Sequence, residues 1–259
     1  MESVIRVFSI VSSCSGENGI TAGFSNMVAE KLSQRAADLG ESIEYECITG
    51  DTIRLSFCRS CNNCFNQGMC PLDKTDDMAK IKEKLLAADI IFFCSPVYLA
   101  GMSGFAKCVI DRMAYFAHRF ELAGKTAAVL VSTSYSYGKE TAEEIKKALQ
   151  FMGASVAYAG YVCRSRNNLN IYIPEQMDKL TDEISDRLLA SLESPGRFIE
   201  VWQDQAFIIR KKINRRALLM NEIAGVDIPD EVKVCTERGY GQYKTLSEYV
   251  SKTYNGWDK

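Results

Sequence analysis

The chain has 259 residues, of which 47% are hydrophobic, so it can form one large α/β core or one domain with an appendage. Its formal net charge of −2 gives no electrostatic basis for binding nucleic acid or an anionic membrane, and no apolar run approaches the ~20 residues that a membrane span needs. Ten cysteines, together with an N-terminus unlike a signal peptide, predict a cytoplasmic protein in which metal binding or redox chemistry is favoured over disulfides.

Segments with the features of strands and helices alternate from residue 4 to residue 192. The predicted strands are apolar runs rich in β-branched residues, and each predicted helix repeats its apolar residues at helical spacing. The strands are expected at 4–12, 43–48, 90–94, 126–132 and 156–163, and the helices at 22–39, 77–88, 103–116, 140–152 and 177–192. This order predicts a doubly wound, five-stranded parallel sheet with helices on both faces.

A Ser-Pro-Gly sequence at 194–196 ends this alternation. A long helix is expected at 197–224, followed by a polar stretch and a short segment that contains Tyr and Trp. The chain is therefore predicted to divide into a domain of residues 1–192 and a helical C-terminal extension of residues 193–259.

Three loops follow strands at the carboxyl edge of the predicted sheet, where ligands bind in folds of this kind. They span residues 12–21, 95–104 and 132–139. The first loop contains serines, glycines and the N-terminus of the first helix, whose free N–H groups bind phosphate without Lys or Arg. An ordinary helix cap is the alternative interpretation of this loop.

The second loop carries the most specific motif. It reads S-P-V-Y from Ser95 to Tyr98 and continues as S-x-x-x-K-x-x-I-D-R from Ser103 to Arg112. With this string the chain resembles the flavodoxin-like NAD(P)H-dependent FMN reductases over most of residues 1–190. The resemblance implies a flavodoxin-like fold and an FMN cofactor whose ring lies against the S-P-V-Y segment.

The resemblance also implies roles for the other two loops. The first loop lacks the arginine of the family's usual G-S-P-R sequence, so its hydroxyl and amide groups are expected to hold the FMN phosphate. The third loop has Ser and Tyr where the family often has glycines, and Tyr135 or Tyr137 is expected to stack on the ring or to hydrogen-bond to it. The implied FMN contacts are Ser13, Ser15, Asn18, Ile20, Thr21, Ser95, Pro96, Val97, Tyr98, Leu99, Ser132, Thr133, Ser134, Tyr135 and Gly138.

Four cysteines with the spacing C-x2-C-x2-C-x5-C lie between the second strand and the next helix: Cys58, Cys61, Cys64 and Cys70. This spacing suits a [4Fe–4S] cluster, while a structural zinc site and free thiols in a tight loop are the alternatives. The spacing, the position and the D-D-M sequence at 76–78 resemble the iron–sulfur flavoproteins, a subgroup of the same family. In that subgroup four such cysteines hold a [4Fe–4S] cluster that exchanges electrons with FMN. Similar loops in other family members imply the alternative of a loop retained for its turn geometry.

The resemblance implies an enzyme that passes electrons from NAD(P)H through FMN to a small-molecule or redox-protein acceptor, with no catalytic side chain because the cofactor carries the chemistry. The alternatives are an electron carrier fed by ferredoxin, a dedicated biosynthetic flavin reductase, and a redox-sensing flavin-binding module. A homodimer or homotetramer is expected, because the apolar face of the long helix needs a cover. The basic side chains at 210–216 of that helix are interpreted as a solvated face, with a subunit contact or an NADPH phosphate contact as alternatives.

Overall fold

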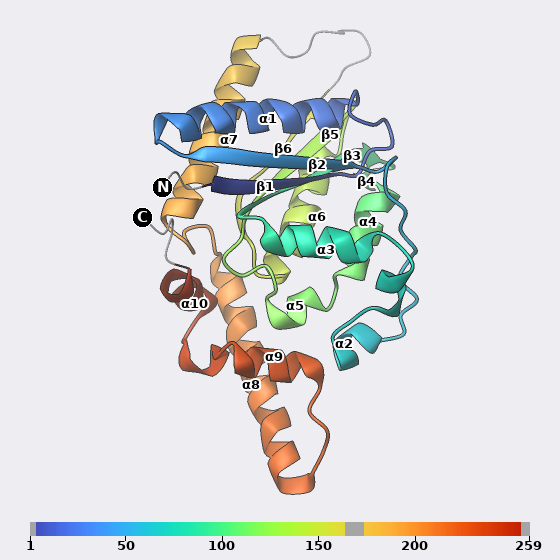
Figure 1. Cartoon of the computed structure of the whole chain (residues 1–259), viewed down its shortest axis with the longest axis vertical. Coiled ribbons are helices and arrows are strands. Elements are labelled where there is room, and N and C mark those ends of the chain that lie inside the picture. Colours follow the sequence, from blue (N-terminus) through green and yellow to red (C-terminus); the bar gives the residue numbers. More distant parts are fainter. Residues whose placement is uncertain (1–3, 164–173, 255–259) are drawn as a thin grey trace.

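Five parallel strands form the centre of the molecule in the computed structural model, which describes residues 4–163 and 174–254 (Figure 1). They lie side by side in the order β2-β1-β3-β5-β6, which confirms the predicted flavodoxin-like parallel sheet. Their bounds are Val4–Val11 for β1, Ser42–Thr49 for β2, Ile90–Tyr98 for β3, Thr126–Thr133 for β5 and Ser155–Cys163 for β6. The strand order reverses between β1 and β3, so the ligand crevice of such a sheet lies at the carboxyl ends of these two strands.

Helices cover both faces of the sheet. On one face lie α1 (Ile20–Asp38) and α7 (Pro174–Glu193), and on the other lie α3 (Met78–Ala87), α4 (Gly104–Arg112) and α6 (Gly138–Phe151). Side chains alternate along a strand, so each strand contributes to both cores. In β3, Phe92 packs with the first pair of helices and Phe93 with the second group, and both are fully buried.

Two segments beside the crevice differ from the prediction. β3 continues to Tyr98, because Val97 and Tyr98 pair with a short antiparallel strand, β4 (Gly101–Met102). The single helix predicted at 103–116 is wrong, since α4 ends at Arg112 and a separate short helix, α5 (Phe116–Arg119), follows. The break allows Met113, Tyr115 and Phe116 all to be buried, whereas a continuous helix would turn part of this run outward.

The C-terminal extension contains α8 (Val201–Ala224), α9 (Asp230–Glu237) and α10 (Leu246–Thr253), with a 3-10 turn, η2 (Tyr240–Gln242), before α10. α8 begins at Val201 rather than at the predicted residue 197, because Glu200 forms a capping box with Gln203. The amide of Glu200 donates to Oε1 of Gln203 at 2.9 Å.

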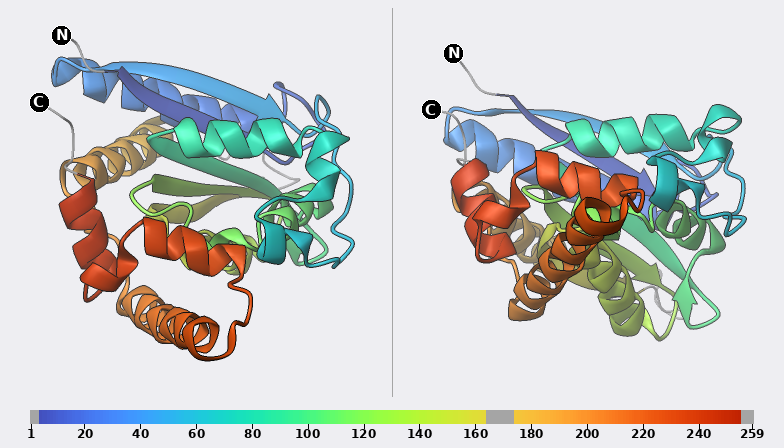
Figure 2. Two further views of the ribbon diagram at one scale, coloured as in Figure 1. Left: turned by 60° about the horizontal axis from the view of Figure 1, so that its bottom comes forward. Right: turned by 90° about the horizontal axis from the view of Figure 1, so that it is seen from below.

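The extension covers much of its own apolar surface. Phe207 of α8 is fully buried against Phe120, Tyr240 and Tyr249, and Figure 2 shows α9 and α10 folded back beside α8. The expectation that a second subunit must cover this helix therefore applies to less surface than the sequence suggested. Oligomerisation and the division at residue 192 stay predictions, and the Trp of the predicted terminal segment lies outside the described residues.

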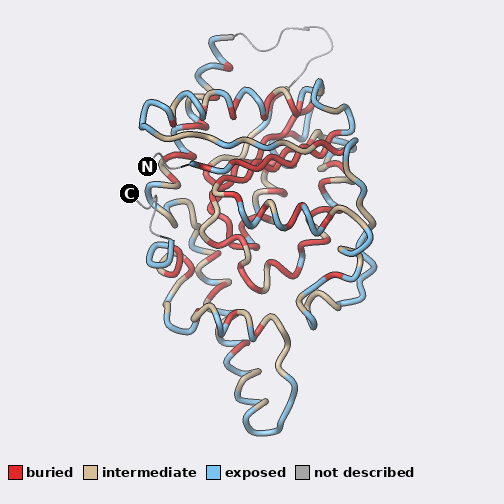
Figure 3. Tube along the Cα trace, viewed as in Figure 1, coloured by how far each residue is buried: buried red, intermediate tan, exposed pale blue. Residues whose placement is uncertain are grey.

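Burial is concentrated in the sheet and the helices beside it, while the far end of α8 is exposed (Figure 3). Among the helices in the described part of the chain, none is both long and apolar enough to cross a bilayer.

Candidate functional site

Buried hydroxyl groups join the three predicted loops at the carboxyl edge of the sheet. Thr21 Oγ1 lies 2.7 Å from Ser132 Oγ, which links the start of α1 to the end of β5. The hydroxyl of Ser103 donates to the carbonyl oxygen of Ser12 at 3.1 Å, and its amide donates to Ser95 Oγ at 3.0 Å. The loops after β1, β3 and β5 therefore form one continuous surface, as the strand order requires.

The first loop turns tightly around Gly19. The amide of Ser15 donates to Ser13 Oγ at 3.2 Å, and Ser13 is buried, whereas Ser15, Asn18 and Ile20 are exposed. A Cβ atom at Gly19 would lie 3.0 Å from Ser15 Cβ, so a larger residue there would require the loop to shift. Gly19 is also the N-cap of α1, and among the described residues no side chain caps this helix. Its first N–H groups are thus left without a side-chain acceptor, which disfavours the ordinary-cap interpretation.

The second loop forms a two-residue hairpin between β3 and β4. Leu99 and Ala100 have φ values of 45° and 66°, the left-handed conformation that a type I′ turn requires at both central positions. The hairpin projects from the sheet, with Tyr98 58% exposed and Leu99 fully exposed. Ser95 is buried, and Pro96 and Val97 are partly buried at its base.

The third loop ends in a close contact between Gly138 and an aromatic ring of β6. Ser132 and Thr133 are buried, and Thr133 Oγ1 donates to the carbonyl oxygen of Ser136 at 2.8 Å. A Cβ atom at Gly138 would come within 2.4 Å of the Tyr161 ring, so only glycine allows this packing.

Four half-exposed tyrosines surround the three loops. Tyr161 joins Tyr98, Tyr135 and Tyr137, and their exposed fractions lie between 46% and 61%. Exposed Ser134 lies in the same loop as two of them. Tyr161 could not be predicted from the sequence, because its contact with Gly138 depends on the pairing of β5 with β6.

The cysteine loop lies beside this edge and holds its four thiols at different depths. Cys58 and Cys61 are exposed, Cys64 is half-buried and Cys70 is buried. Burial, and then the charges of Cys70 and Cys58, raise the pKa of the Cys64 thiol. The amide of Ser60 donates to Cys58 Sγ at 3.5 Å.

The four thiols have the chemistry of an iron–sulfur ligand set, and an amide directed at a cysteine sulfur suits such a set. Within residues 4–163 and 174–254, however, no three His, Cys, Asp or Glu side chains stand in an arrangement that could hold a metal ion. The donor atoms therefore fit the group, while the described loop does not gather three of them around one site.

Arg112, the last residue of the S-x-x-x-K-x-x-I-D-R motif, fixes one side of the cysteine loop. Its side chain is fully buried, and Nη1 donates to the carbonyl oxygen of Ser56 at 2.8 Å and to Asp76 Oδ2 at 2.5 Å. Nη2 donates to Asp73 Oδ1 at 2.7 Å. Burial alone would raise the pKa of Asp76, but the hydrogen bonds from Arg112 and from two backbone amides outweigh it and lower that pKa. Buried ion pairs and hydrogen bonds of Arg112 thus hold α4 and the cysteine loop together.

The C-terminal extension fixes the other side of the loop. The short helix α2 (Asn63–Gln67) contains Cys64, whose carbonyl oxygen accepts a hydrogen bond from Arg119 Nη2 at 3.4 Å. The same guanidinium pairs with Asp230 at the start of α9. Gly68 ends α2 so close to α9 that a Cβ atom there would lie 2.7 Å from Asp230 Oδ2.

An aromatic contact strengthens the same junction. The Phe65 ring lies 4.7 Å from that of His118, and His118 Nδ1 lies 2.5 Å from Glu231 Oε2 of α9. Sequence reasoning had assigned no function to these residues, because each contact joins parts of the chain about 50 or more positions apart.

Two curated iron–sulfur flavoproteins are similar to part of this chain. An iron–sulfur flavoprotein of Methanocaldococcus jannaschii is 38% identical over 102 residues, which cover 39% of this chain and 52% of the relative. An iron–sulfur flavoprotein of Archaeoglobus fulgidus is 29% identical over 118 residues, 45% of this chain and 53% of the relative. The chain thus spans about half the length of these curated relatives.

Solved structures support the fold. A structure of RosB with a bound intermediate matches 80% of this chain and 87% of its own length, with a TM-score of 0.55 and 14% identity. An FMN-dependent NADH-azoreductase from Bacillus anthracis in complex with FMN matches 70% of this chain and 96% of its own length, with a TM-score of 0.52 and 11% identity. At such low identity these likenesses concern the fold alone.

The family model for NADPH-dependent FMN reductases matches residues 5–168, more than half of the chain and all five parallel strands. This agrees with the motif at Ser95–Arg112 and with the flavodoxin-like order of the sheet. The predicted resemblance is thus confirmed: the chain belongs to the family of NADPH-dependent FMN reductases.

Proposed function

We propose that the protein binds FMN at the three-loop edge, takes electrons from NAD(P)H and passes them to a second substrate. The observation that carries the proposal is the joining of the loops after β1, β3 and β5 through buried hydroxyl groups. Bound FMN supplies the hydride and electron chemistry. The chain's own residues have to bind the phosphate, orient the ring and limit the access of water.

The first loop is suited to the phosphate. α1 is 19 residues long and has no side-chain cap at Gly19, so its N-terminal amides and its dipole favour an anion. The side chains of Ser13, Ser15, Asn18 and Thr21 supply further hydrogen-bonding groups around the same turn. A phosphate therefore needs no arginine in this loop.

The second and third loops are suited to the ring. Pro96, at the base of the S-P-V-Y segment, pairs with Ser132, where the third loop begins. Tyr135 and Tyr137 offer flat apolar faces with a polar tip, which suits stacking on a flavin or on a substrate above it. Ile20 and Leu99 add exposed apolar surface at the rim.

A single methyl group at Gly19 is expected to weaken FMN binding about tenfold or more. In Gly19→Ala the new Cβ atom would lie 3.0 Å from Ser15 Cβ and 3.2 Å from the Gly16 carbonyl oxygen, so the phosphate loop would have to open. The dissociation constant can be measured by the quenching of flavin fluorescence when FMN is added to apoprotein.

Gly23→Ala is the matched control, because Gly23 lies one turn further along α1 and a Cβ atom there would meet no atom within 4 Å. This variant should bind FMN as the wild type does and gain about 0.5–1 kcal/mol in stability from the better helix former. Equal FMN affinity in both variants would remove the first loop from the proposed site.

The electron donor is tested by anaerobic titration of the FMN-loaded protein with NADPH and with NADH. We expect at least one of the two to bleach the flavin absorbance with one equivalent of nucleotide. A flavin that dithionite reduces but neither nucleotide bleaches would refute the nicotinamide part of the proposal and leave a protein donor such as ferredoxin.

A second proposed function adds an iron–sulfur cluster to the same protein. It is favoured by the cysteine spacing, by the half-buried and buried positions of Cys64 and Cys70, and by the names of the relatives that share part of this chain. Cys58, Cys61, Cys64 and Cys70 would hold a [4Fe–4S] cluster, which supplies one-electron transfer when bound. Arg112 and Arg119 would position the loop from its two sides. The protein would then be an electron carrier as well as a flavin enzyme.

A further inference from the structure

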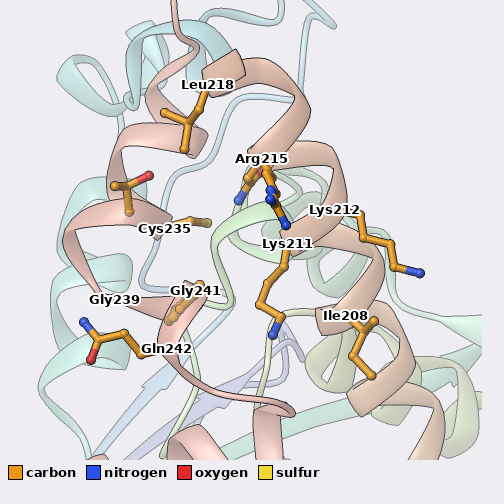
Figure 4. A pocket seen from close by; sticks show the side chains of 12 residues that line it. Ile208, Lys211, Lys212, Arg215, Leu218, Cys235, Gly239, Gly241 and Gln242 are labelled. Carbon is orange, nitrogen blue, oxygen red and sulfur yellow. The ribbon is translucent and has the colours of Figure 1, made fainter. Parts of the chain in front are cut away.

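A cavity separate from the three loops lies within the C-terminal extension. It is enclosed by α8 on one side and by the end of α9 and η2 on the other (Figure 4). Its volume is about 520 Å³, within the range of small-molecule sites in proteins. Neither the family resemblance nor the proposed flavin chemistry requires a cavity at this place.

The wall formed by α8 is apolar at its ends and basic in its middle. Five residues of this wall share one face of the helix, because they follow one another at intervals of three, one, three and three residues. They are Ile208, Lys211, Lys212, Arg215 and Leu218. Figure 4 shows Lys211 and Arg215 between the two walls, while Lys212 points away from the cavity. The opposite wall supplies the buried side chains of Cys235 and Tyr240.

The charge of the lining is one-sided. Three cationic side chains line the cavity, and none of its lining residues is acidic, although the chain as a whole carries a net charge of −2. Lys211 is partly satisfied, because its Nζ donates to the carbonyl oxygens of Tyr243 and Lys244. Within the described ranges, Lys212 and Arg215 take part in no hydrogen bond or ion pair. The cavity therefore attracts an anion.

The other lining residues limit what a ligand can contact. Asn214 lines the cavity, but its Oδ1 atom is buried away from solvent and is out of reach of a bound ligand. Gly239 and Gly241 interrupt the side chains of the opposite wall, which gives a flat body room to approach the backbone there.

We propose that this cavity binds an aromatic carboxylate. Arg215 pairs with the carboxylate, Lys212 adds positive charge at the rim, and Ile208 and Leu218 contact the ring. The proposal does not rest on the flavin or the cluster, because every residue in it belongs to the extension.

The test is calorimetric titration of the FMN-loaded protein with naphthoate, a two-ring aromatic carboxylate. The paired variant Lys212→Gln/Arg215→Gln should bind it about tenfold or more weakly, because the charged partners of the carboxylate are lost. Arg216→Gln is the matched control, since Arg216 is an exposed cation of the same helix that does not line the cavity. Its affinity should stay within about twofold of the wild type.

Two further ligands separate the parts of the proposal. Naphthol, which has the rings without the carboxylate, should bind at least about tenfold more weakly than naphthoate, and inorganic phosphate should not displace naphthoate. The proposal is overturned if naphthoate does not bind at millimolar concentration, if the paired variant binds it unchanged, or if Arg216→Gln weakens its binding equally. Displacement by phosphate would show a simple anion site and refute the aromatic part.

Discussion

Replacing Arg112 with methionine is expected to lower the free energy of unfolding by about 3–5 kcal/mol, the usual cost of removing one partner from a buried ion pair. The guanidinium is fully buried and makes hydrogen bonds to Asp73, Asp76 and the Ser56 carbonyl oxygen. Methionine fills a similar volume but leaves Asp76 without its cation. Lys82 still pairs with Asp73 at 2.7 Å, so the loss should not exceed this range. Urea unfolding followed by circular dichroism measures the difference.

The matched control for Arg112→Met is Lys107→Met, which removes a cation of the same helix. Lys107 and Asp111 form an exposed i,i+4 pair, so this variant should lose no more than about 0.5 kcal/mol. Equal losses in the two variants would contradict the view that Arg112 fixes the cysteine loop.

The dependence of stability on acid pH should also reveal the contact between Arg112 and Asp76. Folding lowers the pKa of Asp76, so its contribution to stability is present above its unfolded-state pKa and is lost as the pH falls through the lower, folded-state value. In Arg112→Met the largest cause that favours the carboxylate is gone, and the part of the acid-induced loss that comes from Asp76 should shrink. An unchanged dependence of stability on pH between neutrality and pH ~3 would speak against the pairing.

Replacing Cys61 with serine is expected to reduce the iron content of anaerobically prepared protein from about four per chain to background, because a [4Fe–4S] cluster needs all four thiolates. FMN content should be unchanged, since Cys61 is exposed and lies outside the three joined loops. Iron, zinc and flavin are measured on the same sample, so that a zinc site would be recognised directly.

Cys47→Ser serves as the control for this loss, because Cys47 is a half-buried thiol of β2 outside the cysteine motif. It should keep both iron and flavin. Wild-type protein that contains flavin but neither iron nor zinc would contradict the cluster and leave free thiols in the loop. Loss of FMN in Cys61→Ser would instead show that the loop supports the flavin site.

We expect the C-terminal extension to hold the cysteine loop in place, a role that the family motifs do not suggest. Asp230 and Glu231 at the start of α9 contact Arg119 and His118, and Arg119 in turn contacts the Cys64 carbonyl oxygen. The extension therefore packs against the loop that contains the proposed ligands, as well as covering its own aromatic residues.

The parallel sheet could be predicted from sequence because each strand is a short apolar run in which β-branched residues recur, and such runs are locally recognisable. β4 could not, since two residues form a strand only through their pairing with Val97 and Tyr98. The break between α4 and α5 was also missed, because helical periodicity continues across it while the burial of Tyr115 and Phe116 depends on tertiary packing.

The candidate site was predicted in outline for a similar reason. Motif positions such as Ser95 and Arg112 are visible in the sequence, but the residues that contact them are not. The two carboxylate partners of Arg112 lie 36 and 39 residues away, and Tyr161 reaches Gly138 from a neighbouring strand. Long-range contacts of this kind are set by topology rather than by local sequence.

The most direct test of the FMN site at the three-loop edge is hydrogen–deuterium exchange of the apoprotein with and without FMN. We expect slower exchange at residues 13–21, 95–104 and 132–138 when FMN is present, and no change at the cavity between α8 and α9. Protection that is confined to the extension, or absent from the first loop, would contradict an FMN site at this edge.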